Sequence, residues 1–152
     1  MHLGHDGAGL LVENGGVIVT NSILWGNTPG EILVAGVCEP SITYSDVAGG
    51  WPGQGNIDVD PLFVRPGAWD PNGTPNDPAD DSWIGGDYHL QSQAGRWDSQ
   101  TQAWIADEAT SPCIDAGDPT SPLGAEPVPN GGVINLGAYG GTAGAAKSNV
   151  QP

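Results

Sequence analysis

The residues around position 75 have the side chains that bind calcium. Carboxylate and amide oxygens gather there within a dozen positions, and calcium takes about six to eight oxygen ligands in a flexible geometry. The candidate ligands are Asp70, Asn72, Asp77, Asp80 and Asp81. The start of the stretch, Asp-x-Asn-Gly, is typical of calcium-binding loops, although an Asp stands at the twelfth position, where such loops need a Glu. The alternative is a solvated acidic loop in which Asp and Asn side chains stabilise turns.

Two pairs of aspartates are candidates for acid–base catalysis on glycans, since glycoside hydrolysis uses two carboxyl groups about 5–9.5 Å apart. The pairs are Asp58 with Asp60 and Asp115 with Asp118. Because the chain has 18 acidic residues, the choice of any pair carries little weight. Asp58 and Asp60 are also a second candidate pair of calcium ligands, because alternate residues of an extended segment point to the same side.

Six tryptophans are many for so polar a chain. Four of them, Trp69, Trp83, Trp97 and Trp104, are candidates for binding carbohydrate. An indole ring offers a large apolar face to a sugar ring, and its N–H donates a hydrogen bond. The alternative is a structural role, since the end of a repeat domain needs a cap whose core such rings would fill.

The composition excludes several classes of protein. Gly and Pro occupy 25 and 14 of the 152 positions, a turn-rich composition that excludes a helical bundle. The 18 acidic and three basic residues give a formal charge of −15, which excludes binding to nucleic acid or anionic lipid through basic contacts. No apolar run approaches the ~18 residues that cross a membrane. Cys38 and Cys113 either form one disulfide or are small buried residues.

The first third of the chain reads as short strands separated by turns, and it contains an internal repeat. Segments 17–27 and 41–49 align with Val19 on Ile42 and Leu24 on Val47, an offset of 23 residues. This period matches one turn of a parallel β-solenoid, in which each coil buries its apolar side chains against the coils above and below. A β-sandwich is the alternative fold.

The rest of the chain is less regular. Residues 69–82 read as a polar loop, and 97–104 as a hairpin in which two Trp rings face each other, with a two-turn helix as the alternative. Residues 111–115 and 133–139 are expected to form the last strands, before a Gly- and Ala-rich tail.

A series of motifs carries a resemblance to a known class of proteins. The motifs are NSILWGN (21–27), ITYSDV (42–47), GNIDVDPLFV (55–64), DYHL (87–90), SPCIDAGDP (111–119) and NLGAYGG (135–141). In this order they resemble the C-terminal end of large right-handed parallel β-helix proteins, which are secreted or cell-surface proteins of environmental bacteria, planctomycete-like ones above all. The likeness implies a fold but no single function, because the superfamily includes pectate-lyase-like enzymes, glycoside hydrolases and adhesins.

We therefore expect an all-β, right-handed parallel β-helix fragment with an irregular, Trp-rich C-terminal cap. Its expected parts are β-helix coils over 1–64, an irregular acidic and Trp-rich region over 65–110, terminal strands over 111–140 and a flexible tail over 141–152. We expect the chain to be part of a longer secreted or cell-surface precursor, and the uncapped first coil to favour a homo-oligomer.

The function predicted from these features is an extracellular binding or scaffold module that contacts polysaccharide and is stabilised by calcium. A neutral glycan is the expected partner, because like charges at an interface are costly and the chain is strongly acidic. The first alternative is a polysaccharide lyase or glycoside hydrolase that uses acidic residues on the β-helix. The second alternative is a self-associating structural subunit.

Overall fold

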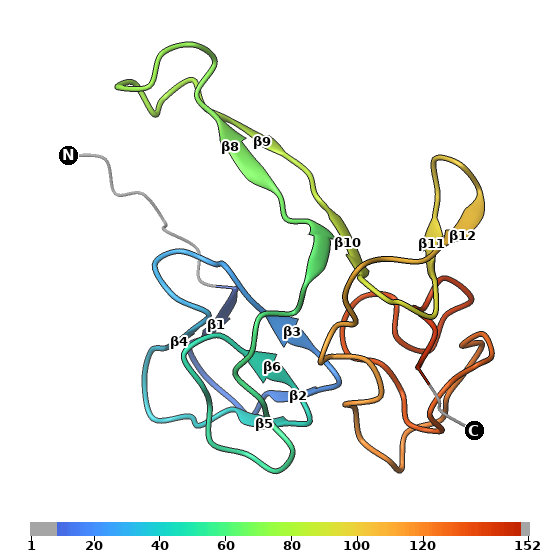
Figure 1. Ribbon diagram of the computed structural model, residues 1–152. Coiled ribbons are helices and arrows are strands. Elements are labelled where there is room, and N and C mark those ends of the chain that lie inside the picture. The colour runs from blue at the N-terminus through green and yellow to red at the C-terminus, as the bar shows by residue number, and fades with distance from the viewer. Residues whose placement is uncertain (1–8, 150–152) are drawn as a thin grey trace.

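The computed structural model describes residues 9–149, and within them the chain is all-β, with twelve short strands and no helix (Figure 1). The strands are β1 (Leu10–Val12), β2 (Ile18–Thr20), β3 (Ile23–Leu24), β4 (Ile32–Val34), β5 (Ser41–Thr43), β6 (Asp46–Val47), β7 (Phe63–Arg65), β8 (Ala68–Asp70), β9 (Ser82–Ile84), β10 (Asp87–Leu90), β11 (Arg96–Asp98) and β12 (Ala103–Ile105). They are short because Gly, Pro, Asn and Asp interrupt the apolar runs. The described part therefore contains no helix long and apolar enough to cross a membrane.

Three parallel pairs of strands make up the N-terminal part: β1 with β4, β2 with β5, and β3 with β6. Their registers place Val19 opposite Ile42 and Leu24 opposite Val47, so the predicted alignment with its 23-residue offset is confirmed. Ile42 and Val47 are almost completely buried, as is Val12 of β1. Of the matched apolar positions, Ile42 and Val47 thus belong to the core of this part, whereas Val19 and Leu24 are half-buried.

The predicted right-handed parallel β-helix is wrong. Every sheet in residues 9–149 has only two strands, and past β6 parallel pairing continues only as an isolated bridge between Asp46 and Ile57. The later pairs, β7 with β10, β8 with β9 and β11 with β12, are antiparallel. Between residues 49 and 61 the chain is rich in Gly, Pro and Asp, with Ile57 and Val59 as its only branched apolar residues, and Pro61 has no N–H to donate to a ladder. The all-β class is confirmed, but neither a closed nor a solenoid sheet forms in the described residues.

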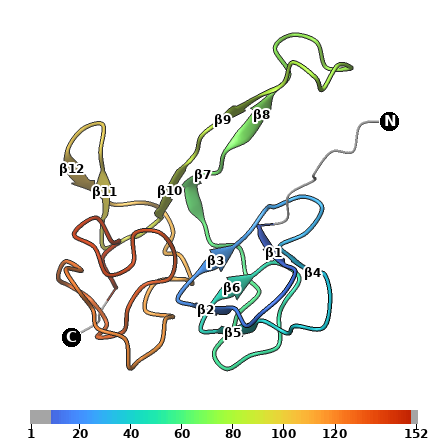
Figure 2. The same cartoon turned by 180° about the vertical axis from the view of Figure 1, so that it is seen from behind.

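Residues 63–90 form a long antiparallel ribbon, which we call the arm. Strands β7 and β10 pair at its foot and β8 and β9 pair further out, so that it projects from the body of the molecule (Figures 1 and 2). The sequence predicted a polar loop over 69–82. The loop is shorter, because Trp69 already pairs with Trp83 and Asp70 with Ser82.

The segment 96–105 is a second hairpin, formed by β11 and β12. Trp97 lies opposite Trp104, with ring centroids 5.6 Å apart and an interplanar angle of 63°. The predicted hairpin with facing tryptophans is confirmed, and the alternative of a helix is wrong. Edge-to-face packing of two large rings stabilises such a short ribbon.

Residues 106–149 pack against the strands without forming any themselves, so the strands predicted over 111–115 and 133–139 are wrong. The core here contains Leu90, Cys113, Leu136 and Ala146. Single backbone hydrogen bonds take the place of ladders, such as that from the Leu136 N–H to the Cys113 carbonyl, 2.9 Å. Although a flexible tail was expected from residue 141, Ala146 is buried and the Lys147 N–H donates to the Gly95 carbonyl.

Candidate functional site

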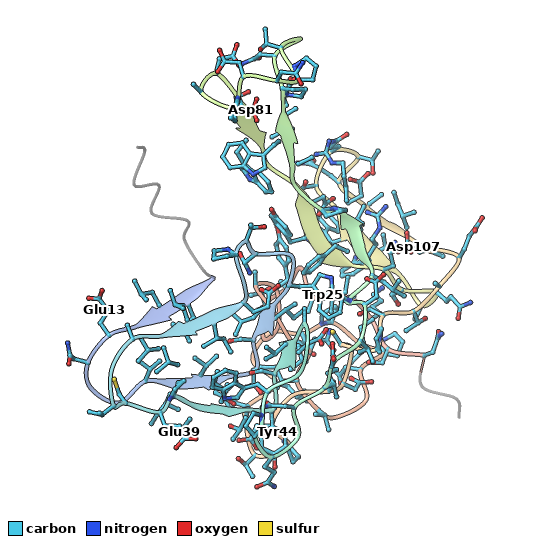
Figure 3. The ribbon with its side chains drawn as sticks, turned by 90° about the vertical axis from the view of Figure 1, so that its left-hand side faces the viewer. Glu13, Trp25, Glu39, Tyr44, Asp81 and Asp107 are labelled. Carbon is cyan, nitrogen blue, oxygen red and sulfur yellow. The ribbon has the colours of Figure 1, made fainter. Side chains whose placement is uncertain are left out.

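A cleft of about 540 Å³ lies where the β3 end of the body meets the foot of the arm. Its lining residues come from three parts of the chain: Asn21, Ser22, Ile23, Trp25, Gly26, Asn27, Phe63, Pro66, Gly67, Trp83, Tyr88, Gly137 and Ala138. Figure 3 shows Trp25 near the foot of the arm. The volume falls within the range of small-molecule sites, about 300–1,000 Å³.

Four aromatic side chains line this cleft: Trp25, Phe63, Trp83 and Tyr88. Phe63 and Tyr88 pack edge to face, with centroids 5.3 Å apart and an interplanar angle of 88°. A Cβ at Gly67 would lie only 2.2 Å from Cζ2 of Trp83 and 2.8 Å from the Tyr88 hydroxyl. Glycine at this position therefore allows both rings to lie against the backbone of the arm.

Polar side chains at the cleft are held by hydrogen bonds. Asn21 accepts from the Asp118 N–H at 2.7 Å and donates to the Ser121 hydroxyl at 2.9 Å. The side-chain amide of Asn27 donates to the Glu31 carboxylate, which also accepts from the Asn27 backbone N–H at 3.0 Å. None of the lining residues is charged. The cleft thus combines aromatic faces with oriented amide and hydroxyl groups, which suits a neutral polar ligand.

The four tryptophans predicted to bind carbohydrate are divided between two hairpins. Trp83 lines the cleft, and Trp69 packs against it edge to face with centroids 5.3 Å apart. Trp97 and Trp104 belong to the second hairpin and do not line the cleft. The Lys147 ammonium lies 4.2 Å from the centroid of the Trp104 ring.

The carboxylates predicted as catalytic pairs do not line the cleft; each accepts hydrogen bonds from nearby loops. The Asp58 and Asp60 carboxylates accept from the backbone N–H groups of Gly49 and Leu62. The Asp115 carboxylate accepts from the Ser148 hydroxyl, and that of Asp118 from the N–H and hydroxyl of Thr120, all at 2.8 Å. In this arrangement the four carboxylates stabilise turns and loop packing.

The residues predicted to bind calcium lie at the outer end of the arm, where Figure 3 shows Asp81. The carboxylate of Asp80 accepts a hydrogen bond from the Thr74 hydroxyl at 2.8 Å, and that of Asp70 accepts from the Asn72 N–H at 2.9 Å. The Asp77 carboxylate accepts from the Ala79 N–H at 3.1 Å. Among residues 9–149 no three His, Cys, Asp or Glu side chains are grouped to hold a metal ion. Calcium binding stays a prediction, which thermal unfolding with calcium and with a chelator tests.

The structure also brings together two side chains that sequence reasoning did not pair. Cys113 Sγ lies 3.1 Å from Asp46 Oδ2, and both residues are fully buried. Burial raises the pKa of the Asp46 carboxyl, and the charges of Asp58 and Asp60 raise it further. Burial and the hydrogen bond to Asp46 raise the pKa of the Cys113 thiol. The repeat carried a signal for the burial of Asp46, because this carboxyl occupies the position that matches the apolar Ile23.

The cleft aromatics Trp25, Phe63 and Tyr88 were also missed. Trp25 follows the repeat strand β3, whereas Phe63 and Tyr88 sit on β7 and β10, about 40 and 60 residues further along. Only the return of the arm onto the body brings them together.

Comparison with known proteins gives one result. A protein-family model described as disaggregatase related matches residues 37–117, which is more than half of the chain. The matched part begins before β5, contains the whole arm and the second hairpin, and ends at Gly117. Neither the curated proteins nor the solved structures include a match.

Proposed function

We propose that this chain, which belongs to the family described as disaggregatase related, is a binding module for neutral polysaccharide. The cleft is its binding site, and the part that matches the family includes the whole arm. The observation that carries the proposal is the lining of the cleft: four aromatic rings, amide and hydroxyl groups, and no charge. The proposal includes a secreted or cell-surface location in an environmental, planctomycete-like bacterium, which rests on the sequence motifs alone.

The chemistry of the cleft matches the two faces of a sugar. The C–H groups of a pyranose ring form apolar patches that pack on aromatic rings, and its hydroxyl groups exchange hydrogen bonds with amides and hydroxyls. Trp83 and Tyr88 are both exposed, so they can exchange water for a sugar face. The polar groups of Asn21 and Ser22 are fixed on the opposite, β3 side of the cleft.

The charge of the protein supports a neutral ligand. At a formal charge of −15 the surface repels polyanions, and the cleft offers no Lys or Arg that would bind a carboxylate or sulfate. A neutral glycan avoids both problems, since its binding requires no charged group to lose its hydration.

Affinity electrophoresis tests the proposal. The protein is run through gels that contain galactomannan, xyloglucan, xylan or mixed-linkage glucan, and we expect at least one of them to retard it. Trp25→Ala removes an aromatic wall of the cleft and should reduce the retardation, whereas Trp104→Ala is the matched control outside the cleft. Retardation by none of the four glycans, or retardation that Trp25→Ala leaves unchanged, would reject the proposal.

The same mixtures also test for catalysis. Incubation with each glycan is followed by assays for new reducing ends and for the absorbance of unsaturated products. Binding without either product supports a binding module. Release of products would replace the proposal by the enzymatic alternative, a lyase or a glycoside hydrolase.

A further inference from the structure

The aromatic surface of the cleft continues outward along the arm. Trp69 and Trp83 are directly opposite each other on β8 and β9, and opposite residues of an antiparallel pair point to the same face of the ribbon. Trp83 lines the cleft, so Trp69 lies on the face of the arm that the cleft occupies. Both rings are strongly exposed, at 64% for Trp69 and 50% for Trp83.

Such exposure needs an explanation, because a large apolar surface that stays in water is costly. Stabilisation of the hairpin is one contribution, but it is not the whole explanation. The second hairpin has a Trp pair of almost the same geometry, yet its Trp104 is less exposed, at 37%, and is covered by the Lys147 ammonium. Of the two pairs, the one on the arm is the more open to solvent, and it is the one that borders the cleft described above.

The angles between the rings limit the shape of a ligand. The planes of Trp69 and Trp83 are inclined by 69°, and those of Phe63 and Tyr88 by 88°. Rings that are inclined in this way cannot lie together on the flat face of a crystalline polysaccharide. They can contact successive units of a single chain that twists, since each unit then presents its face in a different direction.

From this arrangement we propose that the site extends from the cleft to Trp69 and binds several consecutive units of one soluble, twisted neutral glycan chain. The inference rests on the function proposed above. One unit occupies the cleft beside Trp83 and Tyr88, and a neighbouring unit packs on Trp69. The centroid separation of 5.3 Å between the two indoles is comparable to the length of one pyranose unit.

Isothermal titration calorimetry with oligosaccharides of increasing length tests this extension. The probes are the manno-, xylo- and cello- series, each from monosaccharide to hexasaccharide. For a series that binds, we expect affinity to rise with length in the wild type. Trp69→Ala should weaken binding of the disaccharide and of longer members by about tenfold, the size of one lost ring contact, and should leave the monosaccharide affinity unchanged. Trp104→Ala should follow the wild type at every length.

Binding of the monosaccharide also reports on folding, because it uses Trp83, the cross-strand partner of Trp69. If Trp69→Ala weakens all lengths equally, or if the wild type binds all lengths equally, the extension is wrong while the cleft proposal stands. Affinity for microcrystalline cellulose is measured by co-sedimentation. An affinity for this flat surface equal to that for the soluble hexasaccharide would also overturn the inference. If no member of any series binds, the proposed function itself fails.

Discussion

The two cysteines differ in their surroundings, and this difference predicts their reactivity. Cys113 is fully buried and its thiol donates to the Asp46 carboxylate, whereas Cys38 is only partly buried. Burial and this hydrogen bond raise the pKa of the Cys113 thiol, and only the thiolate attacks disulfide reagents. We expect Ellman's reagent to modify one thiol per chain in the native protein and both in denaturant.

The variant Cys38→Ser is the control for this experiment. It should show no fast-reacting thiol in the native state and one in denaturant. Two fast-reacting thiols in the native wild type would contradict the buried position of Cys113. No reactive thiol in denaturant without reductant would indicate a disulfide, which the structure does not contain, because both cysteines are free.

The buried carboxyl of Asp46 predicts a dependence of stability on pH. Burial raises its pKa above the ordinary 3.8 in the folded protein, so the folded state binds a proton more tightly than the unfolded chain. Its contribution is fully present below pH 3.8 and is lost as the pH rises through the raised pKa. We expect the variant Asp46→Asn to remove this loss, since Asn can still accept from the Val59 N–H.

Thermal unfolding of the wild type and of Asp46→Asn between about pH 4 and 7 measures this effect. The melting temperature of the variant relative to the wild type should rise with pH. Asp98→Asn serves as a comparison, because hydrogen bonds, chiefly from Thr101, lower the pKa of Asp98 and give the opposite trend. If the melting temperature of Asp46→Asn relative to the wild type fell as the pH rose, the folded protein would favour the charged form of the Asp46 carboxyl.

The geometry of the arm depends on a tight approach at Gly86, between β9 and β10. A Cβ there would lie 2.4 Å from the Arg65 carbonyl oxygen and 2.5 Å from the Gly67 nitrogen, both backbone atoms. The ribbon would have to separate to admit it, so Gly86→Ala should destabilise the protein by about 1–3 kcal/mol. A Cβ at Gly85 meets nothing within 4 Å, and Gly85→Ala is the matched control.

Urea unfolding of the two variants gives the measurement, with intrinsic Trp fluorescence as the signal. Gly85→Ala should unfold at the same midpoint as the wild type and Gly86→Ala at a lower one. Equal midpoints for all three proteins would show that the arm does not unfold together with the body, or that β7 and β10 do not approach as closely as described.

The sequence predicted those elements that depend on local or periodic signals. The 23-residue offset placed Val19 beside Ile42 correctly, because a fixed period and inward apolar residues determine parallel register. The facing pair Trp97 and Trp104 was correct because a polar turn between two aromatic residues determines a hairpin. The solenoid was wrong because two matched coils do not require a third, and the residues after Val47 favour turns.

The cleft was beyond prediction for a different reason. Trp83 was among the candidates, but nothing in the sequence links it to Trp25 or to Gly137. Their proximity depends on where the arm returns to the body, which tight contacts such as that at Gly86 determine. Contacts of this kind depend on ångström-scale fits between distant backbone segments and leave no periodic signal in the sequence.

At the scale of the whole molecule, the formal charge of −15 predicts that salt stabilises the fold. Self-repulsion among the carboxylates destabilises the compact state, and at 0.1 M salt charges more than about 10 Å apart are largely screened. The melting temperature at pH 7 should therefore rise between low and moderate NaCl. The rise should shrink near pH 4, where many carboxyls are protonated. A melting temperature that falls with NaCl at pH 7 would mean that attractive ion pairs dominate.

The same charge distribution predicts how salt affects ligand binding. Salt should raise the stability of the fold but leave the binding of a neutral glycan unchanged. The cleft contains no charged residue, so retardation by a neutral glycan should be the same in low and high NaCl. Polygalacturonate, a polyanion, should cause no retardation in low NaCl, where repulsion by the acidic surface is strongest. Retardation by polygalacturonate in low NaCl that high NaCl abolishes would show that charged contacts bind the ligand, and the uncharged cleft would then not be the binding site.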